Sequence, residues 1–271
     1  MPRIQESEFR SQELENSTGE IRDTKVKLNQ QLHPDVTCAA AVSLTIYGNH
    51  INNSSLPKKM CSTDKECLEK LRNNATEVRA FLSNKMKPER ERSVCRAFLR
   101  ALGVSFDDSE LSAPTDEPAD VGFRQARFQV RDLLESDRRR GDDWKEKEQE
   151  YGDATLIAET KKPYSPPTPV DVNDLIPEVN AALSKKAKKY GVGCKNLDAL
   201  IYVDLENKFL APDSSVSNVE SLKSQGWRSV SLLFSPYSVV LFAKPEAPDF
   251  LQAEAGQCHQ KWSCIDTLFN A

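Results

Sequence analysis

The stretch EPADVGFRQARFQVRDLL, residues 117–134, decides the fold of this chain of 271 residues. It predicts two short strands joined by a tight turn, with Asp120 on the first strand. The triplet Gln129-Val130-Arg131 lies on the second strand. Because side chains alternate along a strand, Gln129 and Arg131 project to one face of this hairpin and Val130 projects to the other.

The spacing of these polar residues matches a known kind of metal site. In a large class of nucleases, an Asp on one strand is followed on the next strand by an acid-x-Lys triplet. The carboxylates hold Mg²⁺, while the cation orients water and screens the phosphate. Here Gln129 takes the place of the acid, as a weaker neutral ligand, and Arg131 takes the place of the Lys. Spacing alone favours a plain hairpin without chemistry.

A helix before the hairpin supplies a further acid. The segment PERERSVCRAFLRALG begins with Pro88 and ends with Gly103, which are typical residues of a helix start and a helix end. Glu91 precedes the apolar Val94 and Phe98 at helical spacing, so it lies on or beside the apolar face of this helix. Glu89 points toward solvent. We therefore expect Glu91 to approach the polar residues of the hairpin.

The remaining pattern predicts an α/β fold with a mixed central sheet flanked by helices. A helix begins near Thr63, and VSF (104–106) is a short strand candidate. The stretch LDALIYVDL (197–205) predicts a buried central strand, and residues 227–243 predict two strands around a Ser-Pro-Tyr turn. Further helices are expected at about 137–151, 171–191 and 217–226. The Pro-rich KKPYSPPTP (161–169) rules out regular structure.

Composition limits the classes of function. The net charge of −4 excludes a protein that coats nucleic acid through its overall charge, but a local basic cleft remains open. No run approaches the roughly 18 apolar residues of a membrane helix. The seven Cys are an odd number, and the N-terminal segment is polar without a signal sequence. We expect a cytoplasmic protein with reduced thiols and no structural zinc.

Two basic clusters stand out against the acidic average. One lies at the end of the helix at 171–191, and the other contains Lys85, Lys87, Arg90, Arg92, Arg96 and Arg100. Three more Arg residues, at 138–140, lie at the start of the helix at 137–151. Among these cations, the candidates for phosphate contact are Lys185, Lys186, Lys188, Lys189, Arg138 and Arg139. Each cluster has a simpler interpretation, because the Lys residues can form a solvated helix face and the Arg residues can pair with nearby acids.

The chain resembles a small bacterial family of uncharacterised proteins assigned to endonucleases of the PD-(D/E)XK nuclease superfamily. Three blocks carry the resemblance in order, at residues 80–130, 138–144 and 226–251, so that it extends from near Ala75 to Leu251. It implies a restriction-endonuclease-like core. It also implies that Glu91 (or Glu89) is the helix acid, that Asp120 is the first metal ligand, and that Mg²⁺, replaceable by Mn²⁺, is the cofactor. Gln129 departs from the family pattern, which has Glu in ARFEV.

These observations lead to three domain predictions and three functional hypotheses. We expect a variable N-terminal extension (1–61), a nuclease-like domain (62–252) and a C-terminal tail (253–271). The first hypothesis is a metal-dependent nuclease acting on DNA through Glu91, Asp120, Gln129 and Arg131, with Glu91 and Asp120 as the metal ligands. The second is an inactive nuclease-like protein that binds nucleic acid or a protein partner. The third is a structural protein that assembles through the extension, and a homodimer is left open. No membrane is expected as a partner.

Overall fold

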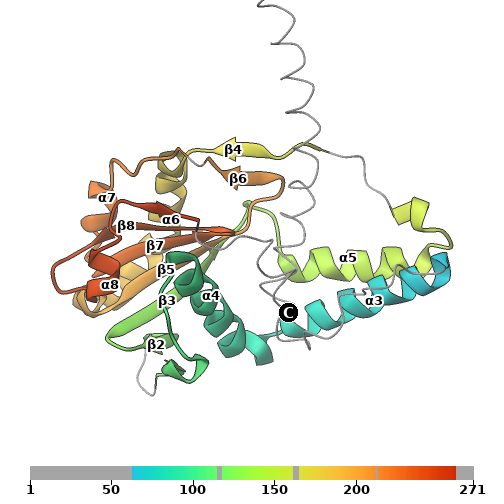
Figure 1. The fold of residues 1–271 in the computed structure, drawn as a ribbon, viewed down its shortest axis with the longest axis horizontal. Helices are drawn as coiled ribbons and strands as arrows, with labels where there is room; N and C mark the ends of the chain where they lie inside the picture. The colour runs from blue at the N-terminus through green and yellow to red at the C-terminus, as the bar shows by residue number, and fades with distance from the viewer. Residues whose placement is uncertain (1–62, 115–117, 161–164, 212, 261–271) are drawn as a thin grey trace, which may run out of the picture.

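A computed structural model describes residues 63–114, 118–160, 165–211 and 213–260. The described residues form a large mixed sheet with helices on both of its faces, a separate two-stranded sheet, and a pair of helices beside the large sheet (Figure 1). The α-helices are α3 (Asp64–Phe81), α4 (Lys87–Leu102), α5 (Arg140–Asp153), α6 (Val172–Tyr190), α7 (Glu220–Lys223) and α8 (Asp249–Gln252). The strands are β1 (Leu111–Ser112), β2 (Val121–Phe123), β3 (Ala126–Leu133), β4 (Thr168–Val170), β5 (Asp198–Val203), β6 (Lys208–Leu210), β7 (Ser229–Phe234), β8 (Tyr237–Ala243) and β9 (Cys258–His259).

The large sheet has seven strands in the order β1-β2-β3-β5-β7-β8-β9. Its centre, β3-β5-β7, is parallel, and both of its flanks are antiparallel. The parallel pair β3 and β5 is joined by a crossover that contains α6, which is the connection that a parallel pair requires. The prediction of an α/β fold with a mixed central sheet flanked by helices is confirmed.

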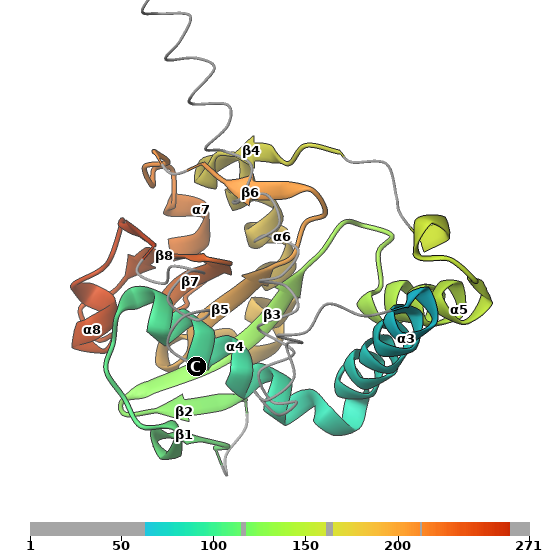
Figure 2. The ribbon, with the colours of Figure 1, turned by 45° about the vertical axis from the view of Figure 1, so that its right-hand side comes forward.

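The sheet is covered on both faces. Helix α4 packs on one face, where its Phe98 meets the ring of Phe128 on β3 edge to face, with ring centroids 5.9 Å apart. Helix α6 packs on the other face with Leu133, Ile201 and Leu232. Figure 2 shows β3 between these two helices. The side chains on the two faces of β3 therefore meet two different helices.

The ends of α4 follow from its sequence. Pro88 lies in the first turn, and Gly103 ends the helix in the left-handed conformation with φ 74°. Glycine adopts this conformation without the steric cost that a Cβ brings. The predicted helix at residues 88–103 is therefore confirmed, and it places Lys87 and Glu91 in the first turns.

Helices α3 and α5 pack on each other and lie beside the sheet rather than on it (Figures 1 and 2). Thr63 caps α3 by accepting a hydrogen bond from the backbone N–H of Glu66 at 3.2 Å. The pair is also joined through polar contacts, since Glu148 on α5 accepts from Thr76 and Arg79 on α3. These two helices form an arm whose ends connect directly to α4 and to β3.

One buried acid lies within the sheet, at the start of β5. Asp198 is fully buried, and its carboxylate accepts from the Arg127 backbone N–H at 3.0 Å and from the Ser229 hydroxyl at 2.8 Å. It also pairs with the guanidinium of Arg228, whose Nε lies 3.0 Å from Oδ1. The acid thus joins the first residues of three adjacent strands.

Three local predictions were wrong. Residues 104–106 form no strand, because the Val104 N–H bonds back to the Leu99 carbonyl of α4. The Pro-rich stretch 161–169 runs into β4, which pairs with β6 in a separate two-stranded sheet that tolerates Pro169 at an edge. Cys67 is disulfide-bonded, so the expectation of reduced thiols fails there, while Cys95, Cys194 and Cys258 are free.

The predicted extension (1–61) and most of the predicted C-terminal tail lie outside the described residues. None of the described helices is both long and apolar enough to span a membrane.

Candidate active site

The candidate site lies along the open edge of β3. Strand β2 pairs only with the first three residues of β3, Ala126–Phe128, because β2 has three residues and β3 has eight. Among the described strands, none pairs with β3 on this side beyond Phe128. Asp120 comes immediately before the first residue of β2. Its backbone N–H donates to the Phe128 carbonyl at 2.8 Å, and its carboxylate Oδ2 accepts from the Val130 N–H at 3.0 Å.

Gln129 also holds the Asp120 carboxylate, through the same oxygen. Its amide Nε2 donates to Asp120 Oδ2, and its Oε1 accepts from the hydroxyl of Tyr190 at 2.6 Å. The Tyr190 oxygen in turn accepts from Lys186 Nζ at 2.9 Å. A carboxylate only accepts, which requires that the NH₂ end of the amide face Asp120. The Gln129 oxygen therefore points away from the carboxylate, toward α6.

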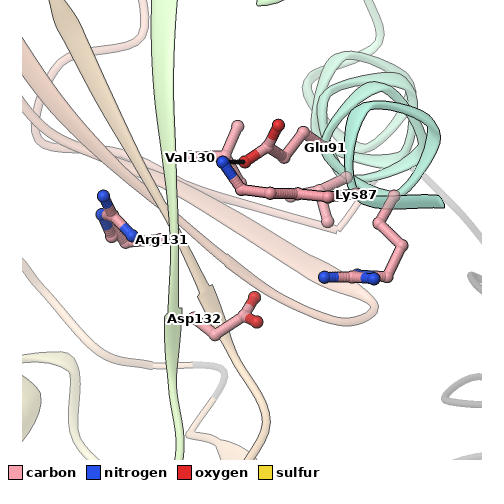
Figure 3. A pocket seen from close by; sticks show the side chains of 7 residues that line it. Lys87, Glu91, Val130, Arg131 and Asp132 are labelled. Carbon is pink, nitrogen blue, oxygen red and sulfur yellow. Dashed lines mark ion pairs between the residues drawn. The ribbon is translucent and has the colours of Figure 1, made fainter. Parts of the chain in front are cut away.

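Glu91 approaches Asp120 from α4, on the opposite face of β3. Lys87 Nζ lies 3.1 Å from Glu91 Oε1 and 3.7 Å from Asp120 Oδ1. Figure 3 shows Lys87 and Glu91 extending together from α4 toward Val130. Both carboxylates are largely buried, with 12% of the Glu91 and 15% of the Asp120 side chain exposed, whereas Lys87 is about half exposed. The two acids thus converge on one cation.

Beside them is a small open pocket of about 70 Å³. Its lining comes from α4 and β3: Lys87, Arg90, Glu91, Val94, Val130, Arg131 and Asp132. The pocket is too small for a nucleotide, but it admits an ion with several waters.

Arg131 does not join Glu91. Figure 3 shows the Arg131 side chain on the opposite side of β3 from Lys87 and Glu91. Strand alternation explains this, since Val130 packs with the α4 cluster and Leu133 with the α6 cluster. The expected convergence of four residues is therefore divided: Glu91 and Asp120 meet on the α4 side, and Gln129 and Arg131 lie on the α6 side.

The electrostatics of the two acids reflect their burial. Burial raises the pKa of Glu91, and the nearby charge of Asp120 raises it further, while Lys87 opposes the shift. Burial also raises the pKa of Asp120, while Lys87, the hydrogen bond from the Val130 N–H and the charge of Arg131 lower it. For Lys87, burial lowers the pKa, but the hydrogen bond to Glu91 and the charges of both acids outweigh it and raise the pKa. For both acids, the effect of burial on the pKa is thus larger than the opposing effect of Lys87.

The basic cluster of α6 adjoins the site through Tyr190. The ammonium groups of Lys186 and Lys189 lie 5.2 Å and 5.8 Å from the centre of the Tyr190 ring. Lys185 and Lys188 lie on the exposed side of the helix. Two of the four predicted lysines are therefore grouped next to Gln129, and two face away.

The basic residues before α5 differ from one another. Arg138 bonds Asp143 at 2.7 Å, the Asp204 carbonyl at 2.9 Å and Glu135 at 3.3 Å, so it is bound to acids of its own chain. Arg139 is exposed and forms the N-cap position of α5 without a side-chain cap. Of the two interpretations of this cluster, pairing with nearby acids describes Arg138.

A divalent ion fits the Glu91–Asp120 position in a limited way. Among the described residues, no three His, Cys, Asp or Glu side chains are grouped so that they could hold a metal. However, Mg²⁺ is commonly bound by one or two carboxylates together with waters and substrate phosphates. The ammonium of Lys87 already marks a place where a cation contacts both acids. Two carboxylates, with other ligands from water and substrate, meet that description.

Two residues of the site were not among the predicted site residues, although Lys87 belongs to the basic cluster at residues 85–100. Lys87 has a signal in the sequence, because it lies four residues before Glu91 and so on the same face of a helix. Tyr190 has none, since its contact with Gln129 joins residues 61 positions apart.

Comparisons with known proteins find similarity to a family model and to a solved structure. A family model described as "Putative endonuclease, protein of unknown function (DUF1780)" matches residues 63–263. No curated protein matches this chain. A solved structure of a protein of unknown function from Pseudomonas aeruginosa strain PAO1, PA4535, described as of the monooxygenase superfamily, is similar at 28% identity with a TM-score of 0.52. That match covers 73% of this chain and 95% of the other.

The descriptions of the two relatives name different chemistries. The family model covers well over half of the chain. The chain belongs to the family described as "Putative endonuclease, protein of unknown function".

Proposed function

We propose that this protein is a metal-dependent nuclease of the PD-(D/E)XK type that hydrolyses phosphodiester bonds of DNA at the open edge of β3. The observation that carries the proposal is the convergence of Glu91 and Asp120, from a helix and a hairpin, on one cation position. The family description supports it more generally. The fold is consistent with it, because a helix, a hairpin and a helical crossover to a parallel strand surround the site.

Glu91 and Asp120 would hold the metal, Mg²⁺ or Mn²⁺ in its place. When bound, such an ion supplies Lewis-acid stabilisation of the phosphate and lowers the pKa of a coordinated water. Gln129 holds the Asp120 carboxylate in its orientation through Nε2, and the Val130 N–H fixes the same oxygen. Gln129 is therefore a positioning residue rather than a ligand, because its oxygen is bound by Tyr190.

The basic side of the site would bind the nucleic-acid backbone. Lys186 and Lys189 lie over the ring of Tyr190, which bonds Gln129 on β3, and Arg131 lies on the opposite side of β3 from Lys87 and Glu91. Cations placed in this way contact phosphates without selecting a base sequence. The overall charge of −4 is compatible with such a local surface.

A second candidate is a nuclease-like protein that binds nucleic acid without cutting it. The observation that favours it is the same Gln129, which stands where this nuclease pattern has a carboxylate and presents NH₂ rather than oxygen to Asp120. In this case the carboxylates would be retained without a bound metal, and the basic surface would carry the function.

Cleavage assays with Mg²⁺ and with Mn²⁺, on single- and double-stranded DNA and RNA, separate the two candidates. We expect metal-dependent cutting by the wild type and a loss of about 100-fold or more in Asp120→Asn and Glu91→Gln. The matched controls are Asp108→Asn and Glu89→Gln, since both acids pair with Arg96 outside the pocket.

The outcomes are distinct. Cutting that survives in Asp120→Asn contradicts the nuclease proposal, as does the absence of cutting with either metal on all four substrates. DNA binding that persists without cutting, and that is lost in Lys186→Gln/Lys189→Gln, supports the second candidate.

A further inference from the structure

Lys87 occupies an unusual place for a cation. It is the first residue of α4, where the helix dipole disfavours positive charge, and the helix has no side-chain cap there. It precedes Glu91 by four residues, the order that stabilises a helix less than Glu before Lys. Local helix energetics therefore do not explain this lysine.

The contacts of Lys87 are with the site. Its ammonium lies between two carboxylates that are themselves largely buried, one from α4 and one from the hairpin. A charge placed between two such acids offsets the repulsion between them. The remaining side chain is about half exposed at the rim of the pocket, so it can leave without disturbing the core.

The other cations around the pocket are held elsewhere. Arg90 donates to the carbonyls of Ser83 at 2.7 Å and Phe81 at 3.3 Å, which ties it to the end of α3. Arg131 projects from the other side of β3 (Figure 3). Lys87 is thus the pocket cation that faces the two acids.

We propose that Lys87 is the exchangeable cation of this site: it holds the position between Glu91 and Asp120 in the metal-free protein, competes there with a divalent ion, and pairs with the substrate phosphate once displaced. The inference rests on the proposed function for its last step. It gives α4 the cation that the nuclease pattern otherwise places on β3, where Arg131 faces away. No bond is made or broken in the exchange, and only the counter-ion of two carboxylates changes.

Direct titration of the protein with Mn²⁺, followed by calorimetry, tests the exchange apart from catalysis. We expect Lys87→Met to bind Mn²⁺ on the order of tenfold more tightly than the wild type, because a competing cation is gone. Lys87→Arg keeps the charge and is expected to bind as weakly as the wild type. Lys85→Met is the control, since Lys85 is exposed and lies outside the pocket.

Cleavage and thermal unfolding complete the test. Lys87→Met is expected to cut DNA about 100-fold more slowly at saturating Mn²⁺. Its metal-free form is expected to unfold at a lower temperature than Lys85→Met, because the two acids are left facing each other. Unchanged Mn²⁺ affinity in Lys87→Met overturns the exchange, and tighter binding with unchanged cleavage overturns the phosphate role.

Failure of the proposed function has a different signature. If the wild type binds Mn²⁺ but cuts nothing, the nuclease proposal falls, while the affinities of Lys87→Met and Lys87→Arg still decide the exchange. If neither the wild type nor Lys87→Met binds Mn²⁺, both proposals fall together.

Discussion

Two acids of the large sheet differ in how their charge is matched. Asp198, at the centre, is fully buried and accepts from the Arg127 N–H on β3, the Ser229 hydroxyl on β7 and the guanidinium of Arg228, just before β7. Asp120, at the open edge, shares its surroundings with a second acid and one half-exposed lysine.

This difference distinguishes an acid with a structural role from acids that are available for chemistry. A buried carboxylate whose lone pairs are all bound gains nothing from a new ligand and serves to join strands. Two carboxylates that face each other with one exchangeable cation gain from an ion of higher charge. The edge acids are therefore the ones to suspect of function, although Asp198 is the more deeply buried.

The largest effect is expected at the central acid. Asp198→Ala leaves the Arg228 charge and several donors without their partner, which costs about 3–5 kcal/mol of unfolding free energy. Urea unfolding measures this loss. The surface variant Asp108→Ala is the control and should cost less than about 1 kcal/mol, since its carboxylate is half exposed. Equal losses in the two variants would contradict the structural role of Asp198.

The pH dependence of stability is the second way to test the comparison. Raised carboxyl pKa values mean that the folded metal-free protein binds more protons than the unfolded chain as pH rises through the shifted range of Glu91 and Asp120. Their contribution to stability is therefore fully present at low pH and falls as pH rises through that range. The double variant Glu91→Gln/Asp120→Asn should lose this component.

Urea unfolding at a series of pH values from roughly 4 to 7 measures the difference between wild type and double variant. The difference isolates the two acids, because the other carboxyl groups are the same in both proteins. Those with a lowered pKa, such as Asp171, give the opposite slope in each curve. Parallel curves for the two proteins would contradict the idea that burial, with the added charge of Asp120 on Glu91, raises the pKa values of the edge acids. Saturating Mn²⁺ should flatten the wild-type curve.

The smallest effect concerns the hydrogen-bond chain behind Asp120. Tyr190→Phe removes the donor to Gln129 Oε1 and frees the amide to rotate, at a cost of about 1 kcal/mol. We expect Mn²⁺ binding to weaken by about fivefold, with little change in the melting temperature. Tyr237→Phe is the control, because its ring packs in the α6 core without a contact to the site. Equal Mn²⁺ affinity in both variants would show that the chain does not position Asp120.

Much of the fold could be predicted from the sequence. The helix at 87–102 is bounded by Pro88 and Gly103, and the central strand at 198–203 has an unbroken apolar run. The turn between β2 and β3 was expected, although Arg124 adopts a positive φ of 50° there without the glycine that usually signals it. The local sequence pattern could not predict which distant strands pair, such as β4 with β6.

The site was predictable in part for a similar reason. Helical spacing directed Glu91 toward the core, and the hairpin brought Asp120 beside Gln129, as expected. The two-residue spacing of Gln129 and Arg131 correctly placed both on one face, but it could not show that α4 would cover the other face. That choice depends on how the helices pack on the sheet, which strand periodicity does not encode.

The shortness of β2 has one more consequence. A strand that outruns its neighbour exposes backbone donors and acceptors, and such an edge invites pairing with another chain. Asp120 meets the first of these donors, the Val130 N–H, with its own side chain. Asp120 thus satisfies an unpaired backbone N–H of the strand with a side-chain oxygen, as an N-cap residue does at the start of a helix. Removing it with Ala would therefore unmask backbone as well as remove a ligand, which is why Asn, which keeps an oxygen at that place, is the substitution to compare.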